Sequence, residues 1–460
     1  MAAYLPVDLP AGHEPLRRWE GKVLVALFVL LVAFCALVVD RSVFQVPRRT
    51  DASVYFRASW ALRSGEKLYE VADDNGLHYA YPPLTAILLM PFADAPPGAA
   101  REWMLPYAWS LGLWIMLSVA ATFLAVHWFA GGLEECATDP ALRTPPPRSR
   151  RWWANRLLPL VVCVAPIGCT YSRGQITPFL LLTIAGMFVA SVRGHSFRSG
   201  LWLSAAICLK VIPGLLLLYP LLRRDWKALA GVAAGGIIGS AVIPALALGP
   251  KEAVEINRQF VDSVIKPGLN LGGTGTLFEE MMSMKRPGCQ SIKAIIHNYQ
   301  NWDPATRPDK PNTATMLAYY TASALLVGGL VLAFVWRRRD DAVGVLTMLG
   351  ALLTVMILIS PESHTHYFCM PMPLVMALAY GSLEGTPRRL LPVPGTLAIL
   401  AVAGFCYAIV MVEFWSRRRE AGIPLYASLI LLVAAVLQLR RKKPAVATPR
   451  ARGVPLARVA

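Results

Sequence analysis

Most of the side chains of this chain that could do chemistry stand outside or at the edges of its apolar segments. Asp51 comes shortly after the first of these segments, which runs from Val23 to Val39. A carboxylate held just outside a membrane can act as the general base that takes a proton from an acceptor hydroxyl. It can equally cap the helix that begins after it, by accepting a backbone N–H. The residue alone leaves both interpretations open.

Three further residues suggest binding of an anion. Lys210 lies inside an apolar segment, where a lone cation is energetically costly. It either has a functional partner or extends its ammonium group to the membrane surface. His364 and His366 stand at another segment boundary. Two imidazoles without a third ligand make a weak metal site, whereas either can donate to a phosphate. We therefore predict phosphate binding, with no metal site and no cofactor.

Other polar and aromatic residues in similar positions could contact a substrate. Tyr81 precedes a rigid Pro-Pro pair, a setting that also suits an aromatic belt at the membrane interface. Arg173 and Gln175 lie between two apolar segments, and Gln175 could bind sugar hydroxyls or cap a helix. Gln290 opens an amphipathic stretch, which could instead be a helix packed on the membrane surface.

The elements that position these residues must be membrane helices. Of the 460 residues, 55% are hydrophobic and 16% are charged, against roughly 25% charged in soluble domains; the mean hydropathy is +0.48. The net charge of +17 would suggest nucleic acid in a soluble protein. In a membrane protein, basic loops face the cytoplasm and contact anionic lipid. We expect membrane lipids as partners, and no nucleic acid.

The pattern of apolar segments predicts an all-α, polytopic integral membrane protein with ten to twelve spans. Segment 200–222 has basic links at both ends and contains Lys210 and Pro213, so we expect a broken or re-entrant helix pair there. The segments that lead to this count are 23–39, 104–130, 157–172, 175–192, 200–222, 228–248, 316–336, 342–360, 367–383, 392–412 and 422–439.

The distribution of basic links divides the chain. We expect residues 1–22 and a basic tail, 440–460, to be cytoplasmic, on either side of one transmembrane catalytic domain, 23–439. Two long loops, 41–103 and 249–313, are then extracytoplasmic. A simple channel does not need such loops, whereas an enzyme or receptor that works on the outer face does.

The ordered set of motifs carries a family resemblance. The segment D-x-x-x-Y-x-x-A-x-x-A-L-x-x-G-x-x-L-Y starts at Asp51 and includes Tyr55, and Y-x-Y-P-P-L follows it. Then come G-Q at Gln175, L-K-x-x-P around Lys210, Q-S-I from Gln290, and S-P-x-S-x-x-H. This succession, between about residues 23 and 385, resembles the polyprenyl-phosphate-mannose-dependent mannosyltransferases of glycosyltransferase family 87, which have the GT-C fold.

The resemblance implies an inverting hexosyltransferase of the plasma membrane whose active site faces outward. It would transfer a hexose, in the first place mannose, from a polyprenyl-phosphate donor to a lipid or glycan acceptor. Asp51 matches the catalytic base, and Lys210 and His366 match positions near the donor phosphate. The substrate-binding positions are Tyr55, Tyr81, Arg173, Gln175 and Gln290.

The chain departs from the family pattern in two places. His364 stands where the family usually has an aromatic residue. The family then usually has two adjacent histidines, of which His366 alone is present here. We predict that both His364 and His366 bind the donor phosphate. Cys289 replaces the usual Asn before the Q-S-I segment.

The alternative function is a transporter or flippase of lipid-linked glycans. Broken helices and an intramembrane cation are compatible with transport. The two large outer loops favour catalysis.

Overall fold

The computed structural model describes residues 13–440 except 45–49, 102, 138, 270, 273–275, 285–287, 337–338, 385, 387 and 412–419. Within this part of the chain the elements are helices, and the β-structure consists of two isolated bridges, Pro15 with Ser149 and Ala72 with His78. The all-α prediction is therefore confirmed. The predicted basic tail, 440–460, lies outside the described residues apart from Arg440, the last residue of α21.

Six helices are long and apolar enough to cross a membrane, which confirms a polytopic membrane protein. They are α1 (Arg18–Phe44), α4 (Tyr107–Glu135), the run Trp226–Leu248 formed by α10 (Trp226–Ile237), the π-helix η5 (Ile238–Val242) and α11 (Ile243–Leu248), α16 (Thr313–Trp336), α17 (Ala342–Ile359) and α21 (Ile423–Arg440). A seventh span results if α5 (Arg150–Val162) and α6 (Val164–Arg173), which meet at 67°, are counted as one broken span.

This count is lower than the ten to twelve spans predicted. Several apolar segments fold as shorter helices: α7 (Thr177–Val192), the run Ile212–Arg223 formed by η4 (Ile212–Leu217) and α9 (Leu218–Arg223), and α19 (Pro394–Ile409). The 16 residues of α7 extend about 24 Å, less than the roughly 30 Å of a bilayer core. By length and composition, the described residues therefore provide six or seven spans.

Two breaks in these helices lie close to the residues of interest. Helix α8 (Ser196–Leu209) ends at Lys210, whose backbone is extended, and η4 begins two residues later. The predicted break in segment 200–222 is thus confirmed. The bend between α5 and α6 at Cys163 was not predicted. Pro166 lies in the first turn of α6, and a proline has no N–H to donate to the carbonyl oxygen four residues earlier, that of Val162 on the other side of the bend.

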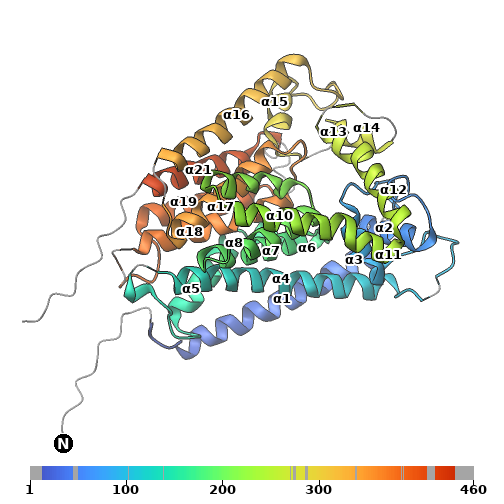
Figure 1. The fold of residues 1–460 in the computed structure, drawn as a ribbon. Coiled ribbons are helices and arrows are strands. Elements are labelled where there is room, and N and C mark those ends of the chain that lie inside the picture. Colours follow the sequence, from blue (N-terminus) through green and yellow to red (C-terminus); the bar gives the residue numbers. More distant parts are fainter. Residues whose placement is uncertain are drawn as a thin grey trace, which may run out of the picture.

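The core of the bundle is formed by α17 and α18 (Met372–Leu383). In α17, 94% of the membrane-length window is buried, and every residue of α18 is buried. Helix α1 is the opposite case, with 6% of its window buried. Figure 1 shows α1 along one edge of the bundle and α16 along the opposite edge. The exposed side chains of α1 are mostly Leu, Val and Phe, so this helix faces lipid.

Helices α8 and α10 pack with their backbones almost in contact. A Cβ atom added to Gly200 would lie 1.9 Å from the Ala228 carbonyl oxygen, and one added to Gly231 would lie 2.1 Å from the Phe197 carbonyl oxygen. Further along, Gly235 of α10 faces Ser204, and Gly239 of η5, which continues α10, faces Cys208. Small residues thus recur every four positions on both helices, as in close pairs of membrane helices. This contact fixes the end of α8, where Lys210 lies.

The two predicted outer loops contain short helices that gather at one end of the bundle (Figure 1). The first loop holds α2 (Ala52–Ser64), α3 (Pro83–Leu88) and η2 (Met90–Phe92); the second holds α12 (Pro250–Phe260), the π-helix η6 (Val261–Ile265), α13 (Lys266–Gly268), α14 (Thr276–Met282) and α15 (Ile292–Gln300). His78 Nδ1 lies 2.6 Å from Glu280 Oε1, and the rings of Tyr69 and Phe260 are 6.1 Å apart. These contacts join the two loops.

Candidate active site

Asp51 stands immediately before α2, and its backbone is anchored to the end of α6. The Asp51 N–H donates to the Arg173 carbonyl oxygen at 2.7 Å, and the Thr50 hydroxyl donates to the same oxygen at 3.0 Å. The Ala52 N–H donates to Thr50 Oγ1 at 3.2 Å, and the Asp51 side chain accepts no capping hydrogen bond. The interpretation of Asp51 as a side-chain cap is therefore wrong.

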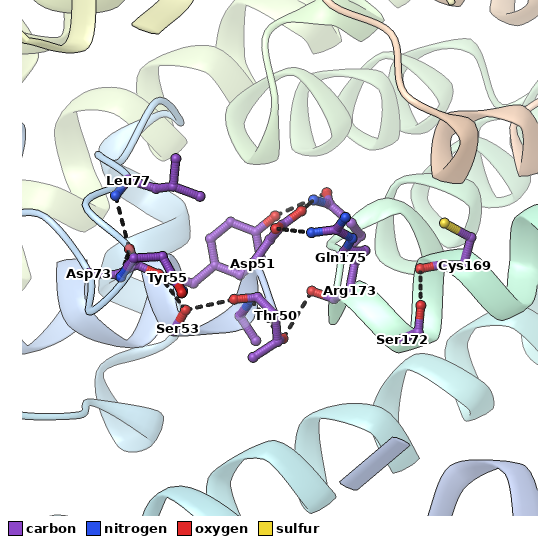
Figure 2. Close-up of polar contacts among 12 residues, drawn as sticks. Thr50, Asp51, Ser53, Tyr55, Asp73, Leu77, Cys169, Ser172, Arg173 and Gln175 are labelled. Carbon is purple, nitrogen blue, oxygen red and sulfur yellow. Dashed lines mark hydrogen bonds and ion pairs between the residues drawn. The ribbon is translucent and has the colours of Figure 1, made fainter. Parts of the chain in front are cut away.

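The Asp51 carboxylate instead faces the turn between α6 and α7 (Figure 2). Gln175 Nε2 donates to its Oδ2 in a short hydrogen bond, and Arg173 Nη1 lies 3.8 Å from its Oδ1. Gly174 makes this approach possible: its φ is +63°, and a Cβ atom there would lie 2.7 Å from the Cβ of Ala52. A side chain at position 174 would push α2 away from the turn.

Burial sets the proton affinity of this carboxyl. The Asp51 side chain is 24% exposed. Burial raises its pKa, whereas Arg173 and the Gln175 amide act in the opposite direction. Burial has the larger effect, so the carboxylate is a stronger base than an exposed Asp.

Gln175 connects Asp51 to a cluster of tyrosines. The Tyr55 hydroxyl lies 3.1 Å from Gln175 Oε1 and 2.9 Å from the Tyr81 hydroxyl. The rings of Tyr55 and Tyr81 meet edge to face at 5.0 Å. Burial raises the pKa of Tyr81 to about 12, so its hydroxyl stays protonated at neutral pH. The Tyr69 hydroxyl donates to the Tyr81 carbonyl oxygen, which holds this segment in place.

Lys210 extends the same network toward the far side of the site. Its ammonium donates to the Tyr81 hydroxyl at 3.3 Å and to the Tyr367 hydroxyl. It also lies over both rings, 4.7 Å from the centroid of Tyr81 and 4.1 Å from that of Tyr367. Both of these hydrogen-bond partners are neutral hydroxyls rather than carboxylates.

The two histidines lie on either side of the Thr365 backbone. His366, on η7 (Thr365–Cys369), is 5% exposed, and its ring meets that of Tyr367 at 4.3 Å. The Thr170 hydroxyl donates to the His366 carbonyl oxygen at 2.8 Å, whereas His366 Nε2 has no hydrogen-bond partner among the described residues. The ring of His364 is 5.8 Å from that of His366. A buried imidazole nitrogen of this kind can bond to a ligand.

Six of the nine predicted site residues form one hydrogen-bonded and ion-paired network: Asp51, Tyr55, Tyr81, Arg173, Gln175 and Lys210. His366 adjoins it through Tyr367. His364 stacks on His366 in turn, and Gln290 is held next to this segment, where its N–H donates to the Ser363 carbonyl oxygen. Among the described residues, no three His, Cys, Asp or Glu side chains form a group that could hold a metal ion.

Tyr367 is a site residue that the sequence analysis missed. It follows His366 directly, and in sequence it resembles any interfacial tyrosine. Its position next to the S-P-x-S-x-x-H motif was the one feature of the sequence that could have indicated a role in the site. Its hydroxyl is separated by 157 positions from the lysine that it contacts.

Comparisons with known proteins agree with the motif pattern. Residues 79–361 match the sequence profile of glycosyltransferase family 87, which is more than half of the chain. A polyprenol-phosphate-mannose-dependent alpha-(1-2)-phosphatidylinositol mannoside mannosyltransferase of Mycolicibacterium smegmatis is 31% identical over 260 residues, 53% of each chain. The protein of the same name from Mycobacterium tuberculosis is 31% identical over 209 residues, 42% of this chain and 45% of its own. The match thus spans about half the length of these relatives.

A longer but weaker match covers nearly the whole chain. A polyprenol-phosphate-mannose-dependent alpha-(1-2)-phosphatidylinositol pentamannoside mannosyltransferase of Mycolicibacterium smegmatis is 25% identical over 446 residues, 94% of this chain and 93% of its own. Among solved structures, ArnT from Cupriavidus metallidurans bound to undecaprenyl phosphate aligns with 90% of this chain and 76% of its own, at 14% identity and a TM-score of 0.37.

Proposed function

Because the chain belongs to glycosyltransferase family 87, we propose that it transfers a mannosyl group from polyprenyl phosphate to a lipid or glycan acceptor. The reaction takes place on the outer side of the plasma membrane. The observation that carries the proposal is one polar network with a carboxylate at one end and a cation at the other: Asp51, Gln175, Tyr55, Tyr81 and Lys210.

Asp51 is the general base in this reaction. Gln175 occupies its Oδ2, so Oδ1 is the oxygen that receives the proton of the acceptor hydroxyl. The acceptor oxygen forms a bond to C1 of mannose while the bond from C1 to the phosphate oxygen breaks. Attack from the face opposite the phosphate inverts the anomeric configuration. The pKa raised by burial favours this proton transfer.

Lys210 and His366 bind the phosphate of the donor. The ammonium of Lys210 stabilises the negative charge that grows on the leaving polyprenyl phosphate. Tyr81 and Tyr367 fix the position of that ammonium, so little reorganisation is needed when the donor binds. His366 Nε2 supplies a hydrogen bond from a buried ring.

Gln175 acts on Asp51 more than on the substrate. Its Nε2 donates to the carboxylate and its Oε1 accepts from Tyr55, so both ends of the amide already have protein partners. It is 3% exposed. These contacts support a positioning role, with Tyr55 and Tyr81 closer to the donor.

The test is a transfer assay with protein purified into nanodiscs. The donor is radiolabelled polyprenyl-phosphate-mannose. The acceptors are phosphatidylinositol mannosides, the lipids for which two relatives are named, and a total membrane lipid extract. We expect a labelled product one mannose larger than the acceptor. Label that crosses vesicle leaflets without a new product would support a flippase instead, and donor binding that is unchanged in Lys210→Met would remove the lysine from the phosphate site.

A further inference from the structure

Tyr55 belongs to the polar network but is fully enclosed by the protein. Its exposed fraction is 0%. Its ring packs edge to face against Tyr81, with the ring centroids 5.0 Å apart, and against Trp114, with the centroids 6.4 Å apart. A substrate bound at the network cannot touch an enclosed side chain. Any contribution of Tyr55 to the reaction must therefore pass through its neighbours.

Tyr55 and Asp51 flank the same glutamine from one face of α2. Asp51 stands directly before α2 with a helical backbone, and Tyr55 follows four residues later, one helical turn away. Gln175 Nε2 donates to Asp51 Oδ2, and the Tyr55 hydroxyl donates to Gln175 Oε1 at 3.1 Å (Figure 2). The Gln175 amide thus lies between the proposed base and the tyrosine.

The backbone of the turn that carries Gln175 is held from the opposite side. Trp114 Nε1 donates to the Gly174 carbonyl oxygen at 2.7 Å, and the Gln175 N–H donates to the Thr170 carbonyl oxygen at 3.0 Å. The turn cannot shift without breaking these bonds. The motion that remains available to Gln175 is rotation of its terminal amide.

This rotation matters because the two ends of an amide are almost equal in size but opposite in hydrogen bonding. The ionised Asp51 carboxylate can only accept, so Nε2 faces it. Once Asp51 has taken a proton it can also donate, and a flipped amide would then offer it Oε1 as an acceptor. The hydroxyls of Tyr55 and Tyr81, 3.1 and 3.5 Å from Oε1, oppose the flip because they would lose that acceptor.

We propose, on the basis of the proposed function, that Tyr55 is a positioning residue whose hydroxyl holds the Gln175 amide with Nε2 toward Asp51. It does so without contacting either substrate. An amide held in this orientation stabilises the ionised carboxylate and not the protonated carboxyl. Asp51 therefore releases its proton more easily after each transfer and is ready as a base for the next one.

The first test is the pH profile of the single-turnover transfer rate in nanodiscs. Tyr55→Phe removes the hydroxyl and keeps the ring that packs against Tyr81 and Trp114. A flipped amide favours protonated Asp51, so the rising limb should move to higher pH. Since one neutral hydrogen bond is lost, the rate on that limb should fall about two- to tenfold, while the affinity for polyprenyl-phosphate-mannose stays within about twofold. The variant leaves in place the other titratable groups around Asp51: Arg173, Lys210, Asp73, Tyr81 and Tyr367.

Tyr380→Phe is the matched control. Tyr380, on α18, is 3% exposed, and its hydroxyl donates to the Leu142 carbonyl oxygen at 3.0 Å, away from the network. The control also loses one buried hydrogen bond, so it should lower the melting temperature without moving the limb. A limb that does not move in Tyr55→Phe, or that moves equally in both variants, would overturn the proposal. Weaker donor binding as the main effect of Tyr55→Phe would also overturn it, because it would indicate a substrate contact.

A double-mutant cycle tests whether Tyr55 acts through Gln175. If it does, Tyr55→Phe should change the rate less than about twofold in a protein that already carries Gln175→Leu, because the amide is then absent. If the two substitutions lower the rate by factors that multiply, Tyr55 acts independently of Gln175 and the proposal fails.

An infrared titration makes the same test without turnover. The band of the protonated Asp51 carboxyl is assigned by its loss in Asp51→Asn. The pKa read from this band should be higher in Tyr55→Phe than in the wild-type protein and unchanged in Tyr380→Phe. If the band shifts in this way but the wild-type protein transfers no mannose, the proposed function fails and the role of Tyr55 stands. If mannose is transferred but the pKa is the same in all three proteins, the role of Tyr55 is overturned and the proposed function stands.

Discussion

Two side chains interact with the Asp51 carboxylate, and the two interactions differ in strength. The Gln175 amide donates to Oδ2, whereas Arg173 Nη1 lies 3.8 Å from Oδ1 on a side chain that is half exposed. Exposed ion pairs contribute little in water. The orientation of the carboxylate therefore depends more on Gln175 than on Arg173, although the arginine carries the charge.

Asp51→Asn should fold normally and lose nearly all transfer. The variant keeps the shape of the side chain but cannot take a proton at neutral pH, and general-base catalysis contributes about 10²–10⁴-fold. Because the Asp51 side chain does not cap α2, the melting temperature should not change. The measurement is the single-turnover rate in nanodiscs, with exposed Asp303→Asn as the control. A rate within a few-fold of wild type would require another base.

The pH profile of transfer should depend on Gln175. In the proposed reaction Asp51 is the base and must be deprotonated, so the rate should rise with pH through its pKa and then level. Gln175→Leu removes a hydrogen bond that lowers this pKa, so the rising limb should move to higher pH and the plateau rate should fall. Gln259→Leu, which also removes a glutamine-to-carboxylate hydrogen bond, should leave the profile in place. A lower rate with an unmoved limb would give Gln175 a merely structural role.

The network is assembled by breaks in helices. Lys210 enters the site where α8 stops, Gln175 where α6 gives way to α7, and Asp51 where α2 begins. At each of these points the helical hydrogen-bond pattern is interrupted, so the side chain can point into the site from the end of an otherwise rigid element. The close α8–α10 contact is what keeps the end of α8 in position.

Gly231→Ala should destabilise the protein by separating α8 from α10. The new Cβ would lie 2.1 Å from a backbone oxygen, which no side-chain rotation can relieve. Overpacking of this kind costs about 1–3 kcal/mol and should lower the melting temperature and weaken donor binding at Lys210. Gly236→Ala is the matched control, since its nearest neighbour would be 3.8 Å away. Equal melting temperatures for the two variants would contradict a tight α8–α10 contact.

Local signals in the sequence predicted the helix break at Lys210, whereas the bend at Cys163 and the long-range contacts were not predicted. Lys210 and Pro213 indicate a broken helix because a buried cation and a proline each oppose a continuous apolar helix. The Asp51–Gln175 pair joins residues 124 positions apart, and no periodicity reports such a contact. Among the described residues, fewer helices than the ten to twelve predicted spans are long enough to cross a membrane, because hydropathy does not register where a helix bends, as at Cys163, or stops short, as in α7. The capping role of Thr50 was hidden because Asp51 is the more familiar cap.

At the scale of the whole molecule, the two outer loops act as one body. The His78–Glu280 ion pair and the Tyr69–Phe260 contact bring residues from both loops together above the bundle. Both loops must therefore lie on the same side of the membrane, whichever side that is. This agrees with the charge distribution that places 41–103 and 249–313 outside.

Cysteine labelling tests that orientation. An impermeant maleimide should label Asp303→Cys, in the second loop, in intact cells. It should label His195→Cys, in a basic link between α7 and α8, after permeabilisation. Both side chains are exposed, so burial does not confuse the result. The reverse labelling pattern would mean that the protein has the opposite orientation in the membrane, with Asp51 on the cytoplasmic side.

The sequence separations between contacting residues determine when the network can form during synthesis of the chain. Asp51 meets Gln175 across 124 positions, Tyr81 meets Lys210 across 129, and Lys210 meets Tyr367 across 157. The ribosome makes these segments one after another. Asp51 is therefore made before Gln175, and Lys210 is made before Tyr367. A nascent chain that ends before residue 367 has Asp51 and Lys210 but lacks one of the lysine's two hydroxyl partners. The network is therefore complete only after residue 367 has been made, late in the synthesis of the chain.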